Sequence, residues 1–122
     1  MIATQAAPQA IGPYSQGIKV GNTVWISGQI PLVAETMEMV SGDITAEATQ
    51  VFKNLRAVAE AAGGELDNAV KINISLTDLG DFDAVNAVMA AHLSEPFPAR
   101  ACVQVAALPK GARIELEAIL VL

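Results

Sequence analysis

The chain has 122 residues, a net charge of −6 and 52% hydrophobic residues, so it is long enough for one domain with a core and too short for two. Its 7 Lys and Arg residues are scattered singly, which argues against nucleic-acid binding, and no apolar run approaches the ~20 residues that a membrane helix needs. The single Cys excludes an internal disulfide and, with the single His, argues against a zinc site, so we expect no metal.

The N-terminal third predicts a β-hairpin. Its start, "MIATQAAPQAIG", lacks the basic residues and the apolar block of a signal peptide, so we expect a cytoplasmic protein. Two β-like runs, Ser15–Val20 and Thr23–Gln29, are joined by Gly21-Asn22, which is a typical hairpin turn. Pro31 then ends the second run.

The middle of the chain predicts a helix, a strand and a second helix. Apolar residues recur at helical spacing in Asp43–Gly64, where Thr45 is the expected N-cap. Alternation of apolar and polar residues in Asn68–Thr77 predicts a half-buried strand. The second helix is expected at Asp81–Leu93, late in which the only His, His92, takes a structural or solvated role.

The last third predicts two further strands, Ala99–Ala106 and Arg113–Val121. The strand at Asn68–Thr77, the second helix and the strand at Ala99–Ala106 form a βαβ unit, so we expect those strands to be parallel with a right-handed crossover. Both helices then cover one face of a mixed β-sheet in a single α+β domain of residues 1–122. The other face of the sheet, the open face, stays free.

The alternation of side chains in the last two strands indicates what lies on the open face. If the aliphatic residues of both strands meet the helices, the open face carries Arg100, Cys102, Glu115 and Glu117. In one interpretation this face is solvated and holds an Arg–Glu cross-strand pair. In the other, further copies of the chain cover it, and Arg100 binds a carboxylate through its two-pronged guanidinium.

Four segments together resemble one known family over nearly the whole chain. They are "AIGPYSQGIKVGNTVWISGQIP", "NLRAVAEAAGG", "VKINISLTDLGDFDAVN" and "FPARACVQVAALPKGARIELEAI". This pattern is similar to that of the Rid family of reactive-intermediate imine/enamine deaminases, and most similar to its RidA subgroup. The resemblance implies a chorismate-mutase-like α+β fold, assembled as a homotrimer with a central β-barrel and with ligand sites in clefts between subunits.

The resemblance also implies an activity. Family members hydrolyse 2-iminoalkanoates and their enamine tautomers, such as 2-iminobutanoate and 2-iminopropanoate, to 2-oxo acids and ammonia, without a metal or organic cofactor. By this resemblance Arg100 holds the substrate carboxylate, and Glu115 positions or activates the attacking water. Tyr14 forms a hydrogen-bonding wall of the cleft, and Cys102 lines it. Further pocket positions of the family fall on Ser27, Gly28 and Asn86.

Several alternatives stay open beside this assignment. Cys102 as a covalent nucleophile lacks a base, Glu117 shares the parity of Glu115, and Tyr14 has the alternative of a buried aromatic with a satisfied hydroxyl. Met37 stands where many family members have Gly, a departure expected to affect the turn more than the pocket. The rival functions are a 2-oxo-acid-binding module without turnover, a chaperone-like role and RNA cleavage, against which the acidic charge argues.

Overall fold

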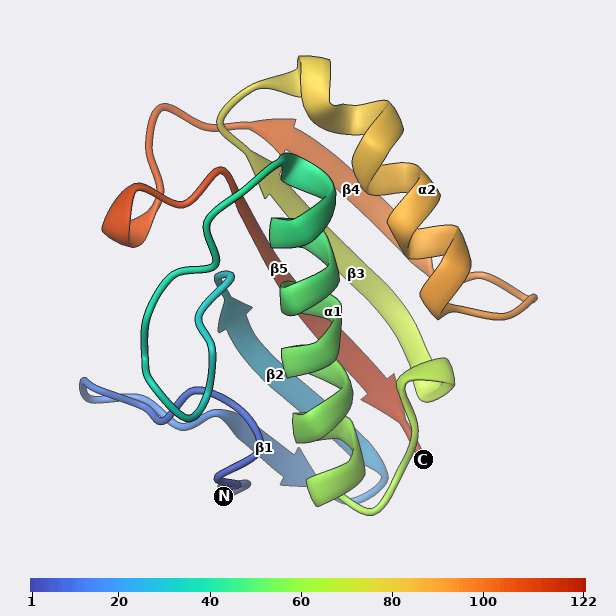
Figure 1. Cartoon of the computed structure of the whole chain (residues 1–122). Coiled ribbons are helices and arrows are strands. Elements are labelled where there is room, and N and C mark those ends of the chain that lie inside the picture. The colour runs from blue at the N-terminus through green and yellow to red at the C-terminus, as the bar shows by residue number, and fades with distance from the viewer.

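The computed structural model describes all 122 residues and contains a five-stranded sheet with two helices on one of its faces (Figure 1). Short 3-10 turns precede β3 and α2 and follow β4. The helices and strands are, in chain order, β1 (Gly17–Val20), β2 (Thr23–Gln29), α1 (Ile44–Ala61), β3 (Ala69–Leu76), α2 (Phe82–His92), β4 (Ala99–Gln104) and β5 (Ile114–Val121).

The sheet is mixed, with the strand order β1-β2-β5-β3-β4. Strands β3 and β4 are parallel, and all other neighbouring strands are antiparallel. The predicted βαβ unit is therefore confirmed as β3-α2-β4, and so is the α+β class. Because β5 and β3 are the central strands, β1 and β4 form the two edges of the sheet.

Helix α1 begins at a different cap from the expected one. The carboxylate of Asp43 accepts a hydrogen bond from the backbone N–H of Ala46 at 2.9 Å, so Asp43 is the N-cap. The prediction of Thr45 as the cap was wrong, because Thr45 already lies in the first turn, where its carbonyl accepts from the Thr49 hydroxyl. An N-cap side chain bonds the N–H two or three residues further on, and Asp43 is placed to do so.

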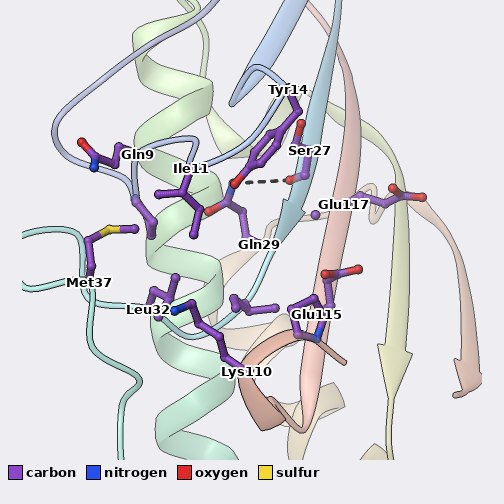
Figure 2. Close-up of a pocket in the computed structure, with 14 residues that line it drawn as sticks. Gln9, Ile11, Tyr14, Ser27, Gln29, Leu32, Met37, Lys110, Glu115 and Glu117 are labelled. Atoms are coloured by element: carbon purple, nitrogen blue, oxygen red, sulfur yellow. Dashed lines mark hydrogen bonds between the residues drawn. The ribbon is translucent and has the colours of Figure 1, made fainter. Parts of the chain in front are cut away.

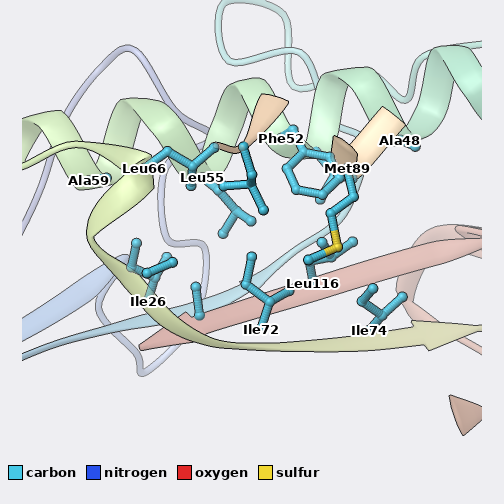
Figure 3. Close-up of a cluster of buried hydrophobic side chains, with 14 of the residues drawn as sticks. Ile26, Ala48, Phe52, Leu55, Ala59, Leu66, Ile72, Ile74, Met89 and Leu116 are labelled. Atoms are coloured by element: carbon cyan, nitrogen blue, oxygen red, sulfur yellow. The ribbon is translucent and has the colours of Figure 1, made fainter. Parts of the chain in front are cut away.

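The hydrophobic core lies between α1 and the sheet (Figure 3). Phe52 and Leu55 of α1 are fully buried against Ile72 of β3 and Leu116 of β5. Each side chain of this size stabilises the fold by about 1.5–3 kcal/mol when it is fully buried. The core therefore fixes the helical face of the sheet, from which alternate residues of β3 and β5 point inward.

The expected orientation of β4 was wrong. Arg100 pairs in register with Ile72 of β3, and Cys102 with Ile74, and both isoleucines are buried under the helices. Since residues in register share a face of a parallel pair, Arg100 and Cys102 lie on the helical face, and Val103 lies on the open face. Aliphatic parity misled here because the helices do not bury β4, whose residues are all exposed except the half-buried Cys102.

The open face of the sheet carries exposed apolar side chains on both sides of a polar band, which is formed by Lys71, Asn73 and Ser75 of β3 and by Glu115 and Glu117 of β5. Its exposed aliphatic and aromatic side chains have exposed fractions between 41% and 63%, and they come from β1, β2, β4 and β5. Large exposed apolar side chains that gather on one face of a protein are typical of surfaces that another molecule covers. Here these side chains are Ile18, Val20, Trp25, Val103 and Val121. Neither helix is long and apolar enough to cross a membrane.

Candidate active site

A cleft of about 510 Å³ opens at the end of β2 and the beginning of β5 (Figure 2). We call it the Glu115 cleft, because the side chain of Glu115 forms part of its wall. The N-terminal segment contributes Tyr14, β2 contributes Ser27 and Gly28, and the turn before β5 contributes Lys110. Four of the seven predicted site residues thus line one cavity: Tyr14, Ser27, Gly28 and Glu115.

A β-bulge in β2 shapes this cleft. Ile26 pairs with Ala118 and Gln29 with Leu116, so β2 has one more residue than β5 over the same stretch. The extra length falls at Ser27-Gly28, and Gly28 lies directly against the Glu115 side chain. A Cβ atom at Gly28 would be only 2.8 Å from Cδ of Glu115. The bare backbone of Gly28 is therefore what leaves room for the carboxyl group.

The Glu115 carboxyl has the electrostatics of a group that exchanges protons. Burial raises the pKa of Glu115 above its usual range, and the neighbouring charge of Glu117 raises it further. Glu117 is more exposed and accepts a hydrogen bond of 3.0 Å from the amide of Asn73. A carboxyl group with a raised pKa can both accept and return a proton at neutral pH, which favours Glu115 over Glu117 for that role.

Ser27 and Tyr14 present polar atoms to the cleft. The Ser27 hydroxyl donates to the carbonyl of Ser15 at 2.5 Å, so only its acceptor lone pairs are left for a ligand. Tyr14 is 51% exposed, and its hydroxyl makes no hydrogen bond within the chain. The alternative of a buried tyrosine with a satisfied hydroxyl is therefore wrong.

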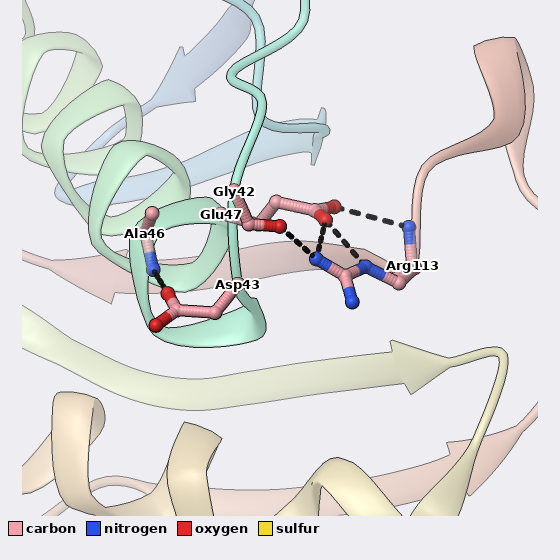
Figure 4. Close-up of polar contacts among 5 residues, drawn as sticks. All are labelled: Gly42, Asp43, Ala46, Glu47 and Arg113. Carbon is pink, nitrogen blue, oxygen red and sulfur yellow. Dashed lines mark hydrogen bonds and ion pairs between the residues drawn. The ribbon is translucent and has the colours of Figure 1, made fainter.

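An ion pair between α1 and the start of β5 fixes the wall that carries Glu115 (Figure 4). The guanidinium of Arg113 contacts the buried carboxylate of Glu47 and donates to the carbonyl of Gly42 at 2.7 Å. The backbone N–H of Arg113 also donates to Glu47, at 3.3 Å. Because Arg113 immediately precedes β5, these contacts hold the strand only two residues before Glu115.

Arg100 lies in a second, separate pocket, which we call the Arg100 pocket. Its guanidinium donates to the side-chain oxygen of Asn86 and lies over the ring of Phe82, 5.0 Å from the ring centroid. No carboxylate pairs with it, since the only ion pair of the chain joins Arg113 and Glu47. The pocket, of about 360 Å³, is lined by Asn86, Met89, Ala90, Phe97, Pro98 and Arg100.

Cys102 is held as a thiol on the same strand. Burial raises its pKa, and the positive charge of Arg100 offsets part of that increase. A raised pKa disfavours the thiolate, which is the nucleophilic form of cysteine. His92 supplies no base, because its ring stacks on Phe52 at 5.4 Å and its Nδ1 lies 2.9 Å from the carbonyl of Val88. No group of three or more His, Cys, Asp or Glu residues gathers to hold a metal.

The chain does not bring Arg100 and Glu115 together. Glu115 pairs with Ser75 of β3 on the open face, whereas Arg100 pairs with Ile72 on the helical face. Strand β3 also separates β4 from β5, so the expected neighbourhood of Arg100 and Glu115 and the Arg–Glu cross-strand pair are both wrong within one chain. The predicted site residues therefore fall into two separate pockets on opposite faces of the sheet.

Met37 and Lys110 are among the residues lining the Glu115 cleft that sequence reasoning missed. Both have positive φ, 58° for Met37 and 56° for Lys110, which non-glycine residues rarely adopt. Met37 was expected to affect the turn more than the pocket, yet its side chain lines the pocket. The Pro109-Lys110-Gly111 run connects the last two strands, and its Pro and Gly are typical of a tight turn.

Comparison with known proteins identifies the family. The model of the endoribonuclease L-PSP family matches residues 4–122. The 2-iminobutanoate/2-iminopropanoate deaminase of Dermatophagoides farinae is 52% identical over 122 residues, which cover 100% of this chain and 95% of the relative. The solved structure of RidA from the Antarctic bacterium Psychrobacter sp. PAMC 21119 is 59% identical, covers 99% of this chain and 98% of that chain, and has a TM-score of 0.96.

A further solved structure carries a small ligand. It is that of Escherichia coli TdcF with bound serine, which is 41% identical, covers 100% of this chain and 98% of that chain, and has a TM-score of 0.93. The fold and the site thus define a small α+β protein of the chorismate-mutase-like class. The chain belongs to the endoribonuclease L-PSP family, which is the Rid family that the sequence motifs resemble.

Proposed function

We propose that the chain is a deaminase that hydrolyses 2-iminoalkanoates, such as 2-iminobutanoate and 2-iminopropanoate, to 2-oxo acids and ammonia. A relative with 52% identity over the whole chain is named for this activity. The observation that carries the proposal is the partly buried carboxyl of Glu115, whose pKa is raised by burial and which lies against the backbone of Gly28 in an open cleft. Proton transfer by such a group suits imine hydrolysis.

We further propose that two copies of the chain build each active site, in a homotrimer. Arg100 has no acidic partner, and its pocket lies on the face opposite to Glu115. A substrate as small as 2-iminopropanoate, with six non-hydrogen atoms, cannot reach both Arg100 and Glu115 of one chain across the sheet. In this proposal the Arg100 that binds its carboxylate therefore comes from a neighbouring copy of the chain. The exposed apolar side chains of the open face support such assembly, because they offer surface that a second copy can bury.

The proposed reaction needs only positioning and the transfer of protons. Arg100 binds the substrate carboxylate bidentately, with Asn86 fixing its guanidinium. Water adds to the iminium carbon while Glu115 accepts one of its protons, and Glu115 then returns that proton to the nitrogen. The C–N bond breaks with its electron pair leaving on ammonia, which takes the remaining hydroxyl proton as the C=O bond of the 2-oxo acid forms.

Ser27 and Tyr14 complete the polar wall in this proposal. The Ser27 hydroxyl already donates to Ser15, so its oxygen is an acceptor for an N–H of the iminium group. The free hydroxyl of Tyr14 is a donor for the developing carbinol oxygen. Holding both reactants in this arrangement is the main catalytic contribution, because an iminium carbon is already electrophilic.

A single assay tests the activity. A threonine dehydratase generates 2-iminobutanoate, and its decay is followed with and without the wild-type protein. We expect faster decay with the wild-type protein and loss of the effect in Arg100→Ala and Glu115→Gln. Unchanged decay with the wild-type protein would refute the deaminase and favour a 2-oxo-acid-binding or chaperone-like module, which aggregation-suppression assays then examine.

Mixing the two variants tests the shared site. Arg100→Ala and Glu115→Gln are unfolded together in equal amounts and refolded, so that mixed assemblies form. If each site takes Arg100 from one copy and Glu115 from the next, about a quarter of the sites contain both native residues and about a quarter of the activity returns. Each variant refolded alone is the control. No recovery in the mixture would contradict a site shared between copies.

The name of the endoribonuclease family raises RNA cleavage as a second candidate activity. The net charge of −6 and the scattered cations argue against an RNA-binding surface. We expect any RNA degradation by a preparation to persist in Arg100→Ala and to disappear on further purification, as a contaminant would. RNA cleavage that stays with the pure protein at constant specific activity would contradict this expectation.

A further inference from the structure

The turn between β2 and α1 holds Met37 in an unusual backbone conformation. Its φ of 58° lies in the left-handed region, which side chains other than Gly generally avoid. The turn is closed on both sides, because the N–H of Met37 donates to the carbonyl of Val33 at 2.7 Å and the N–H of Val33 donates to that of Glu38 at 2.9 Å. Leu32 and Met39 form a β-bridge at its base. An outlier that the surroundings enforce in this way points to a functional role.

The Met37 side chain is part of the wall of the Glu115 cleft. It is half-buried, and it forms one end of the cleft together with Leu32 and Ile11. Figure 2 shows this end of the cleft across the cavity from Glu115, with the sulfur-bearing side chain of Met37 directed inward. The cleft therefore has a polar wall, where Glu115 and Ser27 lie, and an opposite end where Met37, Ile11 and Leu32 present apolar surface bordered by the polar Gln9 and Lys110.

The volume of the cleft exceeds what the smallest substrate needs. 2-Iminopropanoate has only six non-hydrogen atoms, whereas cavities of ~300–1,000 Å³ accommodate ligands of drug size. The Glu115 cleft, at about 510 Å³, lies in that range. In the proposed reaction the imine carbon lies beside Glu115, and in that arrangement the end at Met37 is where a longer side chain of a 2-imino acid has room to extend.

We propose that Met37 sets the length of the apolar side chain that the cleft accepts, and so selects among 2-imino acids. This inference rests on the proposed deaminase function. Met37 is not a catalytic residue, because it lies away from Glu115 and carries no group that transfers protons. Its flexible thioether side chain closes the space into which the branched side chain of a leucine-derived imine would extend.

The test compares two truncations at position 37 with a matched control. Met37→Gly and Met37→Ala both enlarge the end at Met37, but only Gly accepts the positive φ without steric cost. Met39→Ala removes the same side chain from the same turn at a residue that does not line the cleft. An L-amino-acid oxidase supplies the imines of alanine and of leucine, and the ratio of their kcat/KM values is measured beside the melting temperature.

We expect the ratio of kcat/KM for the leucine imine to kcat/KM for the alanine imine to rise by about tenfold in both Met37 variants. One methylene group more or less in an apolar pocket changes the specificity of an enzyme by about 10–200-fold. Met39→Ala should keep the wild-type ratio. Met37→Gly should melt at or above the wild-type temperature and Met37→Ala below it, so a rise common to both is not an effect of stability. A ratio within twofold of wild type in an active enzyme would overturn the Met37 inference alone. A wild-type protein that accelerates the decay of neither imine would overturn the deaminase function.

Discussion

Glu115 places an ionisable carboxyl group where burial opposes its charge. When the pKa of a carboxyl is higher in the folded than in the unfolded state, ionisation of that carboxyl lowers the free energy of unfolding of the protein. This loss of stability is absent at low pH. It appears as the pH rises through the usual glutamate pKa and beyond. The residue that suits proton transfer is therefore one that the fold holds at some expense. Such a trade is common at active sites.

Replacement of this carboxyl tests the trade directly. Glu115→Gln removes the ionisation but keeps the shape, so we expect a higher melting temperature than wild type at pH 7 to 8 and no difference near pH 4. Activity should fall by about 10²–10⁴-fold, the usual contribution of acid–base catalysis. Thermal melts across this pH range, run beside the imine assay, make the measurement. A stability gain that grows toward acidic pH would contradict the direction of the pKa shift.

Gly28 determines where the same carboxyl lies. In Gly28→Ala the new methyl group would be 2.8 Å from Cδ of Glu115, so the Glu115 side chain must move. We expect kcat to fall by at least tenfold with little change in melting temperature, because the carboxylate is at the end of a flexible side chain. Full activity in Gly28→Ala would show that the position of Glu115 is not critical.

The side chains of the site differ in how far the sequence predicts them. Arg100 and Glu115 are visible without coordinates because each is a charged residue in a strand-like apolar pattern, whereas Tyr14 and Ser27 were indicated only by the family resemblance. Met37 could not be recognised as a site residue from the sequence, because an apolar residue in a turn does not interrupt any regular pattern of apolar and polar residues. Its positive φ and its place in the cleft depend on the hydrogen bonds that close the turn.

At the scale of elements, period-two reasoning succeeded for a central strand and failed for an edge strand. In β5 the inward residues are buried by helices, so parity and burial agree. In β4 the more apolar parity faces away from the helices, since the open face carries Val103. Parity states which residues share a face, but only the register with β3 states which face it is.

Removal of the Glu47–Arg113 ion pair, which joins α1 to the start of β5, should lower the free energy of unfolding by a measurable amount. Glu47→Ala leaves the N–H and guanidinium of Arg113 without their acceptor, and we expect the free energy of unfolding to fall by about 1–3 kcal/mol. Glu60→Ala removes an exposed glutamate of the same helix and should cost less than about 0.5 kcal/mol. Urea unfolding at one protein concentration compares them. Equal effects of the two substitutions would contradict a role for the Glu47–Arg113 pair.

At the scale of the whole molecule, the fold class follows from the order of elements, but the assembly does not. A hairpin followed by a βαβ unit and a last strand predicts a mixed sheet with helices on one face, and the structure has that arrangement. How a second copy docks depends on surface shape, which no pattern in one chain encodes. The exposed apolar side chains of the open face are the feature from which we infer the homotrimer.

A charge on the open face should therefore dissociate the assembly. Val103→Glu alters a side chain that is already exposed in the single chain, so we expect a folded 12.7 kDa monomer without activity. The only tryptophan, Trp25, lies on the same face, and its emission should shift to longer wavelength on dissociation. Sedimentation measures the mass, with Ala61→Glu on α1 as the control. A wild-type monomer in sedimentation would refute the assembly.

The division of the site between opposite faces of one sheet has a consequence for how the protein responds to its own abundance. In the proposed shared site, a lone chain carries both Arg100 and Glu115 but holds them on opposite faces, so it has no complete centre and we expect turnover per chain to depend on concentration. Progressive dilution should leave specific activity constant until the assembly starts to dissociate and then reduce it more steeply than the protein itself. There would thus be a threshold concentration of protein, below which imines are hydrolysed only by the uncatalysed reaction with water.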